Sequence, residues 1–227
     1  MKAELLGAMG DDLMVINVAR VSYGKWKYEY DESDTRLIKY LQKHNHLSPF
    51  YHPKIQFRIE CPIFVERQIL KHSVGFISSG DVSQNSISGR YVDFSEEFWE
   101  PTELREQSKD SKQGSSGIMN RPDLLKKMED SMYEAGILYK ELVEEGVAKE
   151  LARTILPLSL MTKFIWTGSL YAYLHLFKLR LKEDAQKETR LLVQSMFDQV
   201  VETNRFPVTI KTFFPDYDIA DWGDNNG

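Results

Sequence analysis

The chain has 227 residues, of which 42% are hydrophobic and 28% are charged, and this composition is ordinary for a globular protein with one substantial core. A formal net charge of −5 excludes a protein that coats nucleic acid with its whole surface, while it leaves room for a local basic pocket that binds a small anion. The single cysteine, Cys61, excludes an intramolecular disulfide and argues against a cysteine-based metal site.

The amino terminus gives no sign of a targeting segment. Residues 1–13 carry acidic side chains early and hold no long apolar core, so we expect no signal peptide. No apolar run in the chain approaches the roughly 20 residues that a membrane-spanning helix needs. We therefore expect a soluble cytoplasmic protein, or one of the host cytoplasm if the source is viral, without membrane or nucleic acid as a partner.

The first elements along the chain are two short helices. Apolar residues at helical spacing predict a helix over 13–21, and Asp11 and Asp12 precede it, where acidic side chains favour a helix start. The same spacing predicts a second helix over 35–44.

A strand and a third helix follow. Residues 54–61 alternate strictly between apolar and polar side chains, which predicts a half-buried strand. Pro62 suits the first turn of a helix over 63–72. Residues 73–89 are rich in glycine and serine, and residues 102–124 are rich in serine and lysine. We expect mostly loop in the first segment and a mobile surface loop in the second.

The carboxyl-terminal half is predicted to be helical. A long amphipathic pattern covers 123–145, and Gly146 is well placed to end that helix. We expect three further helices, over 147–158, 169–180 and 183–202. The pattern as a whole predicts one α+β (α/β) domain over residues 1–227, in which long helices pack on a mostly antiparallel sheet.

The common nucleotide and metal motifs are absent from the sequence. There is no GxGxxG segment, no Walker A loop and no HExxH. His44, His46 and His52 lie close together, but no carboxylate pattern completes a metal shell around them. We therefore expect no metal site, and interpret these histidines as groups that organise loop hydrogen bonds.

Cys61 has two interpretations. It could act as a nucleophile, or it could be a small buried core residue. It continues the apolar face of the predicted strand and has no nearby base in the sequence, which favours the core interpretation.

The segment over 66–94 could form an anion site. Gln68, Lys71 and His72 are spaced i, i+3 and i+4, so a helix would place them on one face. The small residues that follow could bring backbone N–H groups close to a phosphate, and Arg90 could add a bidentate contact. A solvated helix face followed by a flexible surface loop is the alternative.

Two arginines sit among apolar neighbours. Arg153 lies in ELARTILPL and Arg180 in LHLFKLRL, where burial is expected. A buried arginine requires an anion close by. Helix acids could supply it through internal salt bridges, and a bound phosphate or a polarised pyrimidine would serve equally well.

Taken together, these residues resemble a known family. RQ-x-x-KH at 67–72 followed by NSISGRY at 85–91 is similar to the motif of flavin-dependent thymidylate synthases, in which Arg-His-Arg is followed after seven residues by Ser-x-Arg. Five further blocks resemble the family in the same order: 19–22, 44–52, 61–68, 151–170 and 174–188.

The resemblance implies a fold, an activity and cofactors. It implies a single α/β domain that assembles as a homotetramer with active sites shared between subunits. It also implies conversion of dUMP to dTMP, with FAD reduced by NADPH, methylenetetrahydrofolate as the carbon donor, and no cysteine nucleophile. The protein would position the substrates and polarise them, while the flavin carries the hydride chemistry.

The resemblance also assigns roles to individual residues. Arg180 resembles the arginine that favours ionised uracil and so acts in catalysis. The residues that look like dUMP contacts are Gln68, Lys71, Ser86, Ser88, Gly89, Arg90, Arg153 and Arg180. The residues that look like FAD contacts are Ser22, Ser48, Lys71, His72, Ser73, Asn85, Ser169, Tyr171 and His175.

The motif departs from the family pattern at several points. Lys71 and Ser73 replace two arginines, so two guanidinium forks are lost. Fourteen residues, 74–87, stand where the pattern has seven. Ser86 and Tyr51 stand where the family commonly has glutamate. These changes bear on FAD affinity and motivate two alternatives: a related C5 modification such as hydroxymethylation, or a nucleotide-binding homologue without catalysis.

Overall fold

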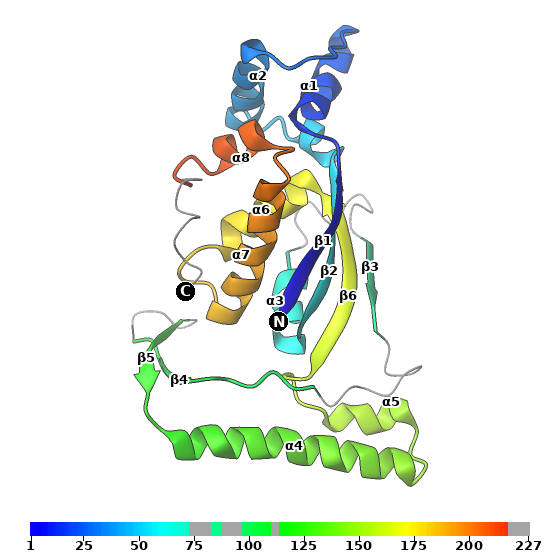
Figure 1. Ribbon diagram of the computed structural model, residues 1–227, viewed down its shortest axis with the longest axis vertical. Helices are drawn as coiled ribbons and strands as arrows, with labels where there is room; N and C mark the ends of the chain where they lie inside the picture. Colours follow the sequence, from blue (N-terminus) through cyan, green and yellow to red (C-terminus); the bar gives the residue numbers. More distant parts are fainter. Residues whose placement is uncertain (73–82, 88–96, 110–113, 218–227) are drawn as a thin grey trace.

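The computed structural model describes residues 1–72, 83–87, 97–109 and 114–217. Within them, a sheet of antiparallel strand pairs, in the order β1-β2-β6-β3, runs through the middle of the molecule (Figure 1). The strands are β1 (Lys2–Met9), β2 (Lys54–Pro62), β6 (Met161–Ser169) and β3 (Ser83–Ser86). The expected antiparallel sheet is therefore confirmed.

The alternation of β2 explains which face of the sheet is buried. Ile55, Phe57 and Ile59 are completely buried, whereas Gln56 and Arg58 between them are exposed. Because side chains alternate across a strand, a single pleat turns all the apolar groups to one face. The opposite face of this central strand is polar and lies open in the single chain.

Two helices cover the buried face. They are α6 (Leu170–Arg180) and α7 (Lys187–Glu202), which lie side by side against the sheet in Figure 1. Tyr173 of α6 is fully buried among aromatic rings, and its hydroxyl donates to the carbonyl oxygen of Trp166 at 3.0 Å. Burial of large side chains from both layers supplies the main stabilisation of this core.

The upper end of the molecule in Figure 1 is helical. It contains α1 (Asp12–Arg20), α2 (Glu32–Lys43), α8 (Pro207–Phe213) and the short turns η1 (Val21–Tyr23) and η2 (Ser48–Tyr51). Asp11 begins α1, as expected, by accepting a hydrogen bond from the N–H of Met14 at 2.8 Å. Asp12 holds this end together, because its buried carboxylate accepts from the N–H groups of Val208 at 2.7 Å and Thr209 at 3.1 Å in α8.

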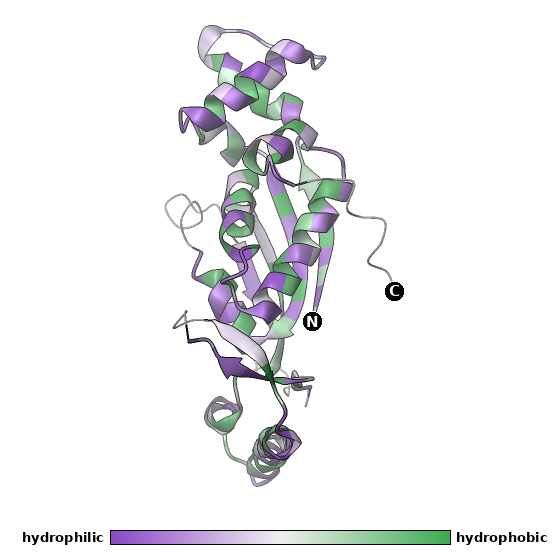
Figure 2. Ribbon diagram, turned by 90° about the vertical axis from the view of Figure 1, so that its left-hand side faces the viewer, coloured by the Kyte–Doolittle hydropathy of each residue, from purple (hydrophilic) through white to green (hydrophobic). Residues whose placement is uncertain are grey.

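The lower end holds a second, two-stranded sheet and a long helix. Its elements are β4 (Leu104–Gln107), β5 (Ser115–Met119), α4 (Pro122–Glu144), α5 (Lys149–Ala152) and η3 (Arg153–Ile155). Figure 2 shows α4 end-on, set apart from the helices that cover the sheet. Gly136 lets α4 approach Phe98, since a Cβ at this position would lie 3.1 Å from the ring.

The predictions for residues 102–158 are only partly correct. The prediction that residues 102–124 form a loop is wrong, because β4 and β5 occupy much of this segment. The predicted mobility of the segment stays a prediction. The helix expected over 147–158 is reduced to α5 and one 3₁₀ turn. Gly146 does end α4, with a φ of 86°. Among the described residues, no helix has the length and apolarity to cross a membrane.

Candidate functional site

Arg180, the last residue of α6, is the centre of the candidate site. Its Nε–H donates to Nε2 of His72, and its Nη2 donates to the backbone carbonyl of Gln68 at 3.3 Å. Both acceptors are neutral, and within the described part of the chain no carboxylate lies close enough to form an ion pair with Arg180. Burial lowers the pKa of this half-buried guanidinium, and the charge of Asp184 opposes that shift. Of the two alternatives for Arg180, the internal salt bridge is not formed among the described residues, which leaves the positive charge available to an anionic ligand.

His72 is the partner that holds Arg180. It follows the end of α3 (Ile63–Leu70), and only 8% of it is exposed. Burial lowers the pKa of His72 to about 4, and the charges of Arg180 and His175 act in the same direction. His72 is therefore neutral at pH 7 and accepts through Nε2, which places its remaining proton on Nδ1.

A run of aromatic rings leads away from His72. Its ring centroid lies 6.4 Å from that of His175, which stacks on Tyr171 at 6.2 Å, and Tyr171 contacts Tyr51 of η2 at 5.2 Å. Tyr171 and His175 are four residues apart in α6 and so face the same side. We call these four residues the aromatic wall. It ends at Arg180, and a wall of this kind is suited to pack against a planar heterocycle.

The side chain of Gln68 is held by α7. Its Nε2 donates to Oε1 of Gln186, and its Oε1 accepts from the hydroxyl of Thr189 at 3.0 Å. Gln186 in turn donates through Nε2 to Oε2 of Glu188 at 2.9 Å. We call Gln68, Gln186 and Glu188 the amide relay. Gln186, Glu188 and Thr189 were not among the predicted site residues, although Gln186 and Glu188 lie at the end of the family-like block over 174–188 and Thr189 follows it.

A basic cavity of about 390 Å³ lies beside the relay. Arg105 of β4 lines it together with Lys187, Arg190 and Gln186. Arg105 pairs with Glu188 at 2.6 Å, whereas Nη1 of Arg190 donates to the backbone carbonyl of Glu183 at 3.2 Å. Lys187 pairs with Glu103 at 2.7 Å, so Arg190 is the cation of this lining that forms no ion pair among the described residues and could contact an anionic group.

Strand β3 contacts a carboxylate of α3. Asn85 and Ser86 lie opposite Ile165 and Phe164 of β6 and are exposed. The hydroxyl of Ser86 hydrogen-bonds with the carboxylate of Glu66, a residue that the sequence analysis missed. Burial raises the pKa of Glu66, while hydrogen bonds from Gln84 and Ser86 and the charge of Arg67 lower it less. A carboxylate from α3 thus lies where the motif itself has lost one.

Two expectations about the basic residues are wrong. Because α3 ends at Leu70, Lys71 does not share the face of Gln68 and His72: it is exposed, while His72 is buried. Arg153 is exposed in η3, because this part of the chain packs against α4 at the surface and leaves Leu151 63% exposed as well. Burial was inferred for Arg153 from apolar neighbours that are themselves partly in solvent.

The serines predicted to hold FAD lie in different surroundings. Ser22 is exposed in η1, and Ser48 is exposed at the start of η2, the turn that ends at Tyr51 of the aromatic wall. Ser169 is buried and caps α6, since its hydroxyl accepts from the N–H of Ala172 at 3.2 Å. Ser22, Ser48 and Arg153 make no contact with Arg180 within the described part of this chain. Four further predicted residues lie outside the described residues: Ser73, Ser88, Gly89 and Arg90.

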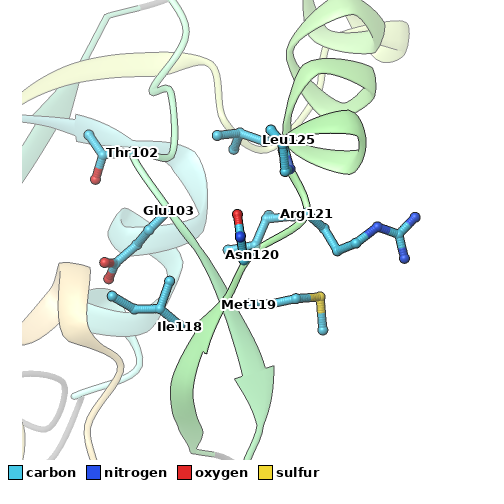
Figure 3. Close-up of a pocket in the computed structure, with 9 residues that line it drawn as sticks. Thr102, Glu103, Ile118, Met119, Asn120, Arg121 and Leu125 are labelled. Carbon is cyan, nitrogen blue, oxygen red and sulfur yellow. The ribbon is translucent and has the colours of Figure 1, made fainter.

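A second cavity, of about 240 Å³, lies between the two-stranded sheet and the start of α4 (Figure 3). Figure 3 shows the guanidinium of Arg121 pointing away from Glu103 on the opposite side. Arg121 is engaged by Asp123 through hydrogen bonds of 2.8 and 2.7 Å. No group of reactive side chains converges here, so this cavity is not a candidate active site.

His44, His46 and Cys61 are structural groups in the described part of the chain. No group of three potential metal ligands occurs among the described residues. His44 and His46 instead pack their rings around Tyr40, at 4.3 and 5.9 Å between centroids. Cys61 is completely buried, and burial raises the pKa of its thiol to about 12. The core interpretation of Cys61 is confirmed, because a thiol of this kind forms almost no thiolate at pH 7.

The fold has solved counterparts. It is similar to that of the UMP/dUMP methylase PolB from Streptomyces cacaoi bound with 5-Br dUMP, with a TM-score of 0.80, 27% identity and coverage of 95% of each chain. A second structure of that protein, bound with 5-Br UMP, matches with a TM-score of 0.76 and 26% identity, over 94% of this chain and 93% of that one. The chain thus shares the single-domain α+β fold of a pyrimidine nucleotide methylase.

The family follows from the sequence comparisons. Residues 4–207 match the family described as thymidylate synthase complementing protein. A flavin-dependent thymidylate synthase of Thermus thermophilus is 41% identical over 92% of this chain and 74% of its own. One of Kosmotoga olearia is 37% identical over 92% of this chain and 88% of its own. The chain belongs to the flavin-dependent thymidylate synthases, a family of enzymes.

Proposed function

We propose that the chain methylates dUMP to dTMP, with methylenetetrahydrofolate as the carbon donor and NADPH-reduced FAD as the source of hydride. One observation carries the proposal: Arg180 is half-buried, is held by neutral partners, and forms no ion pair with a carboxylate among the described residues. A half-buried cation of this kind is stabilised when an anionic ligand binds beside it. Membership of the family gives the class of that ligand.

Arg180 would act on the uracil ring. A guanidinium beside the ring stabilises the negative charge of uracil ionised at N3, and that charge makes C5 more nucleophilic. No thiolate is needed to activate the ring in this scheme. The buried, neutral thiol of Cys61 agrees with such a route.

The remaining dUMP contacts stay predictions. Gln68 lies beside Arg180, and Ser86 reaches the carboxylate of Glu66, so both fit a nucleotide that spans this region. Lys71 is exposed and could contact a phosphate from the open side. The residues proposed to complete the set are Ser88, Gly89, Arg90 and Arg153.

The aromatic wall suits the flavin. Tyr171, His175 and His72 form a continuous series of rings, and Nδ1–H of His72 can donate to a ring nitrogen or oxygen. FAD, once reduced by NADPH, would supply the hydride that completes the methyl group. The chain's own part is to hold that ring system beside Arg180 and to keep water away from it. Other contacts proposed for FAD are Ser22, Ser48, Lys71, Ser73, Asn85 and Ser169.

We also propose that the chain assembles as a homotetramer with shared sites. Ile137 of α4 is 66% exposed and Leu151 of α5 is 63% exposed, and these two helices contact each other, so both apolar groups are available for contact with another copy. Ser22 follows α1 and Arg153 follows α5 along the chain, and Figure 1 shows these two helices at opposite ends of the molecule, with α6 between them. Neighbouring copies that cover the apolar groups would supply such residues to each other's sites. Light scattering during size exclusion tests this: a monomeric mass at micromolar concentration contradicts it.

The test of the activity uses the purified protein. We expect a yellow protein, or one that turns yellow with added FAD, whose flavin is bleached by NADPH without oxygen and recovers when dUMP and methylenetetrahydrofolate are added. The product should be dTMP. A protein that never binds flavin contradicts the proposal. A hydroxymethylated product supports the alternative C5 modification, and dUMP binding without turnover supports a non-catalytic homologue.

A second candidate substrate is UMP. The likeness to the UMP/dUMP methylase bound with 5-Br UMP favours it, since that protein accommodates a ribonucleotide in the same fold. The same assay with UMP in place of dUMP decides the matter. Flavin reoxidation with UMP at a rate close to that with dUMP supports a dual substrate, and none with UMP restricts the enzyme to deoxynucleotides.

A further inference from the structure

The amide relay ends in a buried carboxylate. Only 4% of Glu188 is exposed, and its two oxygens accept from different groups: Oε1 from Arg105 at 2.6 Å and Oε2 from Gln186 at 2.9 Å. Burial raises the pKa of Glu188, but hydrogen bonds from Arg105, its own N–H and Gln186, and the charge of Arg105, bring it below the usual value. Glu188 is therefore ionised at neutral pH and accepts hydrogen bonds without donating any.

An acceptor of this kind fixes the direction of every amide joined to it. Gln186 must turn its NH₂ group toward Glu188, so its oxygen faces Gln68. Gln68 must then turn its own NH₂ group toward Gln186, which leaves its oxygen toward Thr189. The hydroxyl of Thr189 can donate or accept, so it adapts to either orientation and sets neither.

We propose that Glu188 is a positioning residue that fixes, through Gln186, which edge of the Gln68 amide is presented to the nucleotide. The inference rests on the proposed nucleotide site. In the observed orientation the hydrogen bonds of the described residues leave one N–H and one lone pair of the Gln68 amide unused, on a residue whose backbone carbonyl accepts from Arg180. Inversion of the amide exchanges the two, so that any nucleotide atom paired with Gln68 would meet a group of the wrong polarity.

The substitution Glu188→Gln should invert the relay. Arg105 only donates, so it will hold the oxygen of the new amide and turn its NH₂ group toward Gln186. Gln186 must then present its oxygen to residue 188 and its NH₂ group to Gln68, and Gln68 turns over in response. The new side chain keeps nearly the same volume, and each relay bond can still be formed. Only the direction of the hydrogen bonds changes.

A paired substitution restores the direction. In the variant that combines Gln186→Glu with Glu188→Gln, the carboxylate moves one step closer to Gln68. Arg105 donates to the amide oxygen at 188, the amide NH₂ donates to the carboxylate at 186, and Gln68 donates to that carboxylate again. Gln186 is partly exposed on the basic cavity, where Lys187 and Arg190 favour a negative charge.

The experiment compares steady-state turnover of dUMP by the wild type, Glu188→Gln, the paired variant and Glu103→Gln. The last is the matched control, because Glu103 also contacts Arg105, at 3.5 Å, but lies outside the relay. We expect Glu188→Gln to raise KM for dUMP about tenfold, as the loss of one well-placed hydrogen bond does, with kcat within about threefold. The paired variant should return KM to within about threefold of the wild type, and Glu103→Gln should leave it there.

The outcomes separate this inference from the proposed function. A wild type that neither binds nor converts dUMP refutes the proposed function itself. If the wild type is active and Glu188→Gln leaves KM unchanged, the positioning role is refuted. It is also refuted if the paired variant does not restore KM, because an increase in KM caused only by loss of the Arg105–Glu188 ion pair would persist in that variant. If Glu188→Gln does not fold, Gln186→Met cuts the relay with the ion pair intact, and an unchanged KM then overturns the inference.

Discussion

Replacing His72 by glutamine tests whether a neutral His72 holds Arg180. The pKa of His72 is lowered from 6.5 to about 4 by burial, by Arg180 and by His175, so protonation favours the unfolded chain. The stability that the folded protein gains from a neutral, buried His72 is fully present above pH 6.5 and is lost as the pH falls toward 4. The shift corresponds to at most about 3 kcal/mol of unfolding free energy. Glutamine keeps an acceptor for Arg180 but cannot take up a proton.

The assay is urea unfolding of the wild type and His72→Gln at several pH values between 4 and 8. From pH 7 to pH 4, the unfolding free energy of the wild type should fall by up to about 3 kcal/mol relative to that of His72→Gln, because only the wild type has a histidine at this position that takes up a proton on unfolding. Titrating groups that do not interact with His72, Glu66 among them, are common to both proteins and cancel in the difference. His44→Gln, at an exposed position, controls for the loss of any histidine. A difference that stays constant across this range refutes the neutral-acceptor role.

Three further substitutions probe the site and the scaffold. Arg180→Lys keeps a positive charge but loses the planar, bidentate guanidinium group, so it should lower the rate of dTMP formation by about 100-fold or more while the flavin absorbance is retained. A rate within a few-fold of the wild type contradicts the role of Arg180. Cys61→Ala should leave turnover nearly unchanged while it lowers the unfolding free energy by about 1–2 kcal/mol, and a folded but inactive variant would restore a nucleophilic role. Asp12→Ala removes the acceptor for α8 and should destabilise the protein by about 2 kcal/mol in urea unfolding, whereas an unchanged midpoint excludes that role.

The sequence predicted those elements whose pattern is strong and local. The alternation over 54–61 gave β2, because each apolar side chain there reaches the core. Strand β1 was missed because it is an edge strand in which only Ala3 is buried, and its register shifts between Leu5 and Gly7. In β6 the inward positions include Thr162, so the alternation of apolar residues is broken. Hydrophobic periodicity alone therefore does not predict a strand that lies at the edge of a sheet or that has small or polar residues at its inward positions.

The site was predicted in part, and for a different reason. Gln68, His72 and Arg180 came from the resemblance, and the structure brings them together. Gln186 and Glu188 could not be found from spacing, because the contact of Gln186 with Gln68 depends on how α7 docks against α3, more than one hundred residues away along the chain. Long-range docking decides which polar residues meet, and a single sequence does not contain that geometry.

The placement of the acids explains how the site keeps its positive charge. A carboxylate next to Arg180 would pair with it and compete with an anionic substrate for the guanidinium. Glu188 is instead neutralised by Arg105, and it reaches the site only through the neutral side chains of Gln186 and Gln68. The neutral ring of His72 holds Arg180 from the other side without adding a charge. Directional order is thus transmitted to the site through hydrogen bonds, while the charge of Arg180 is left for the ionised uracil that the proposed reaction requires.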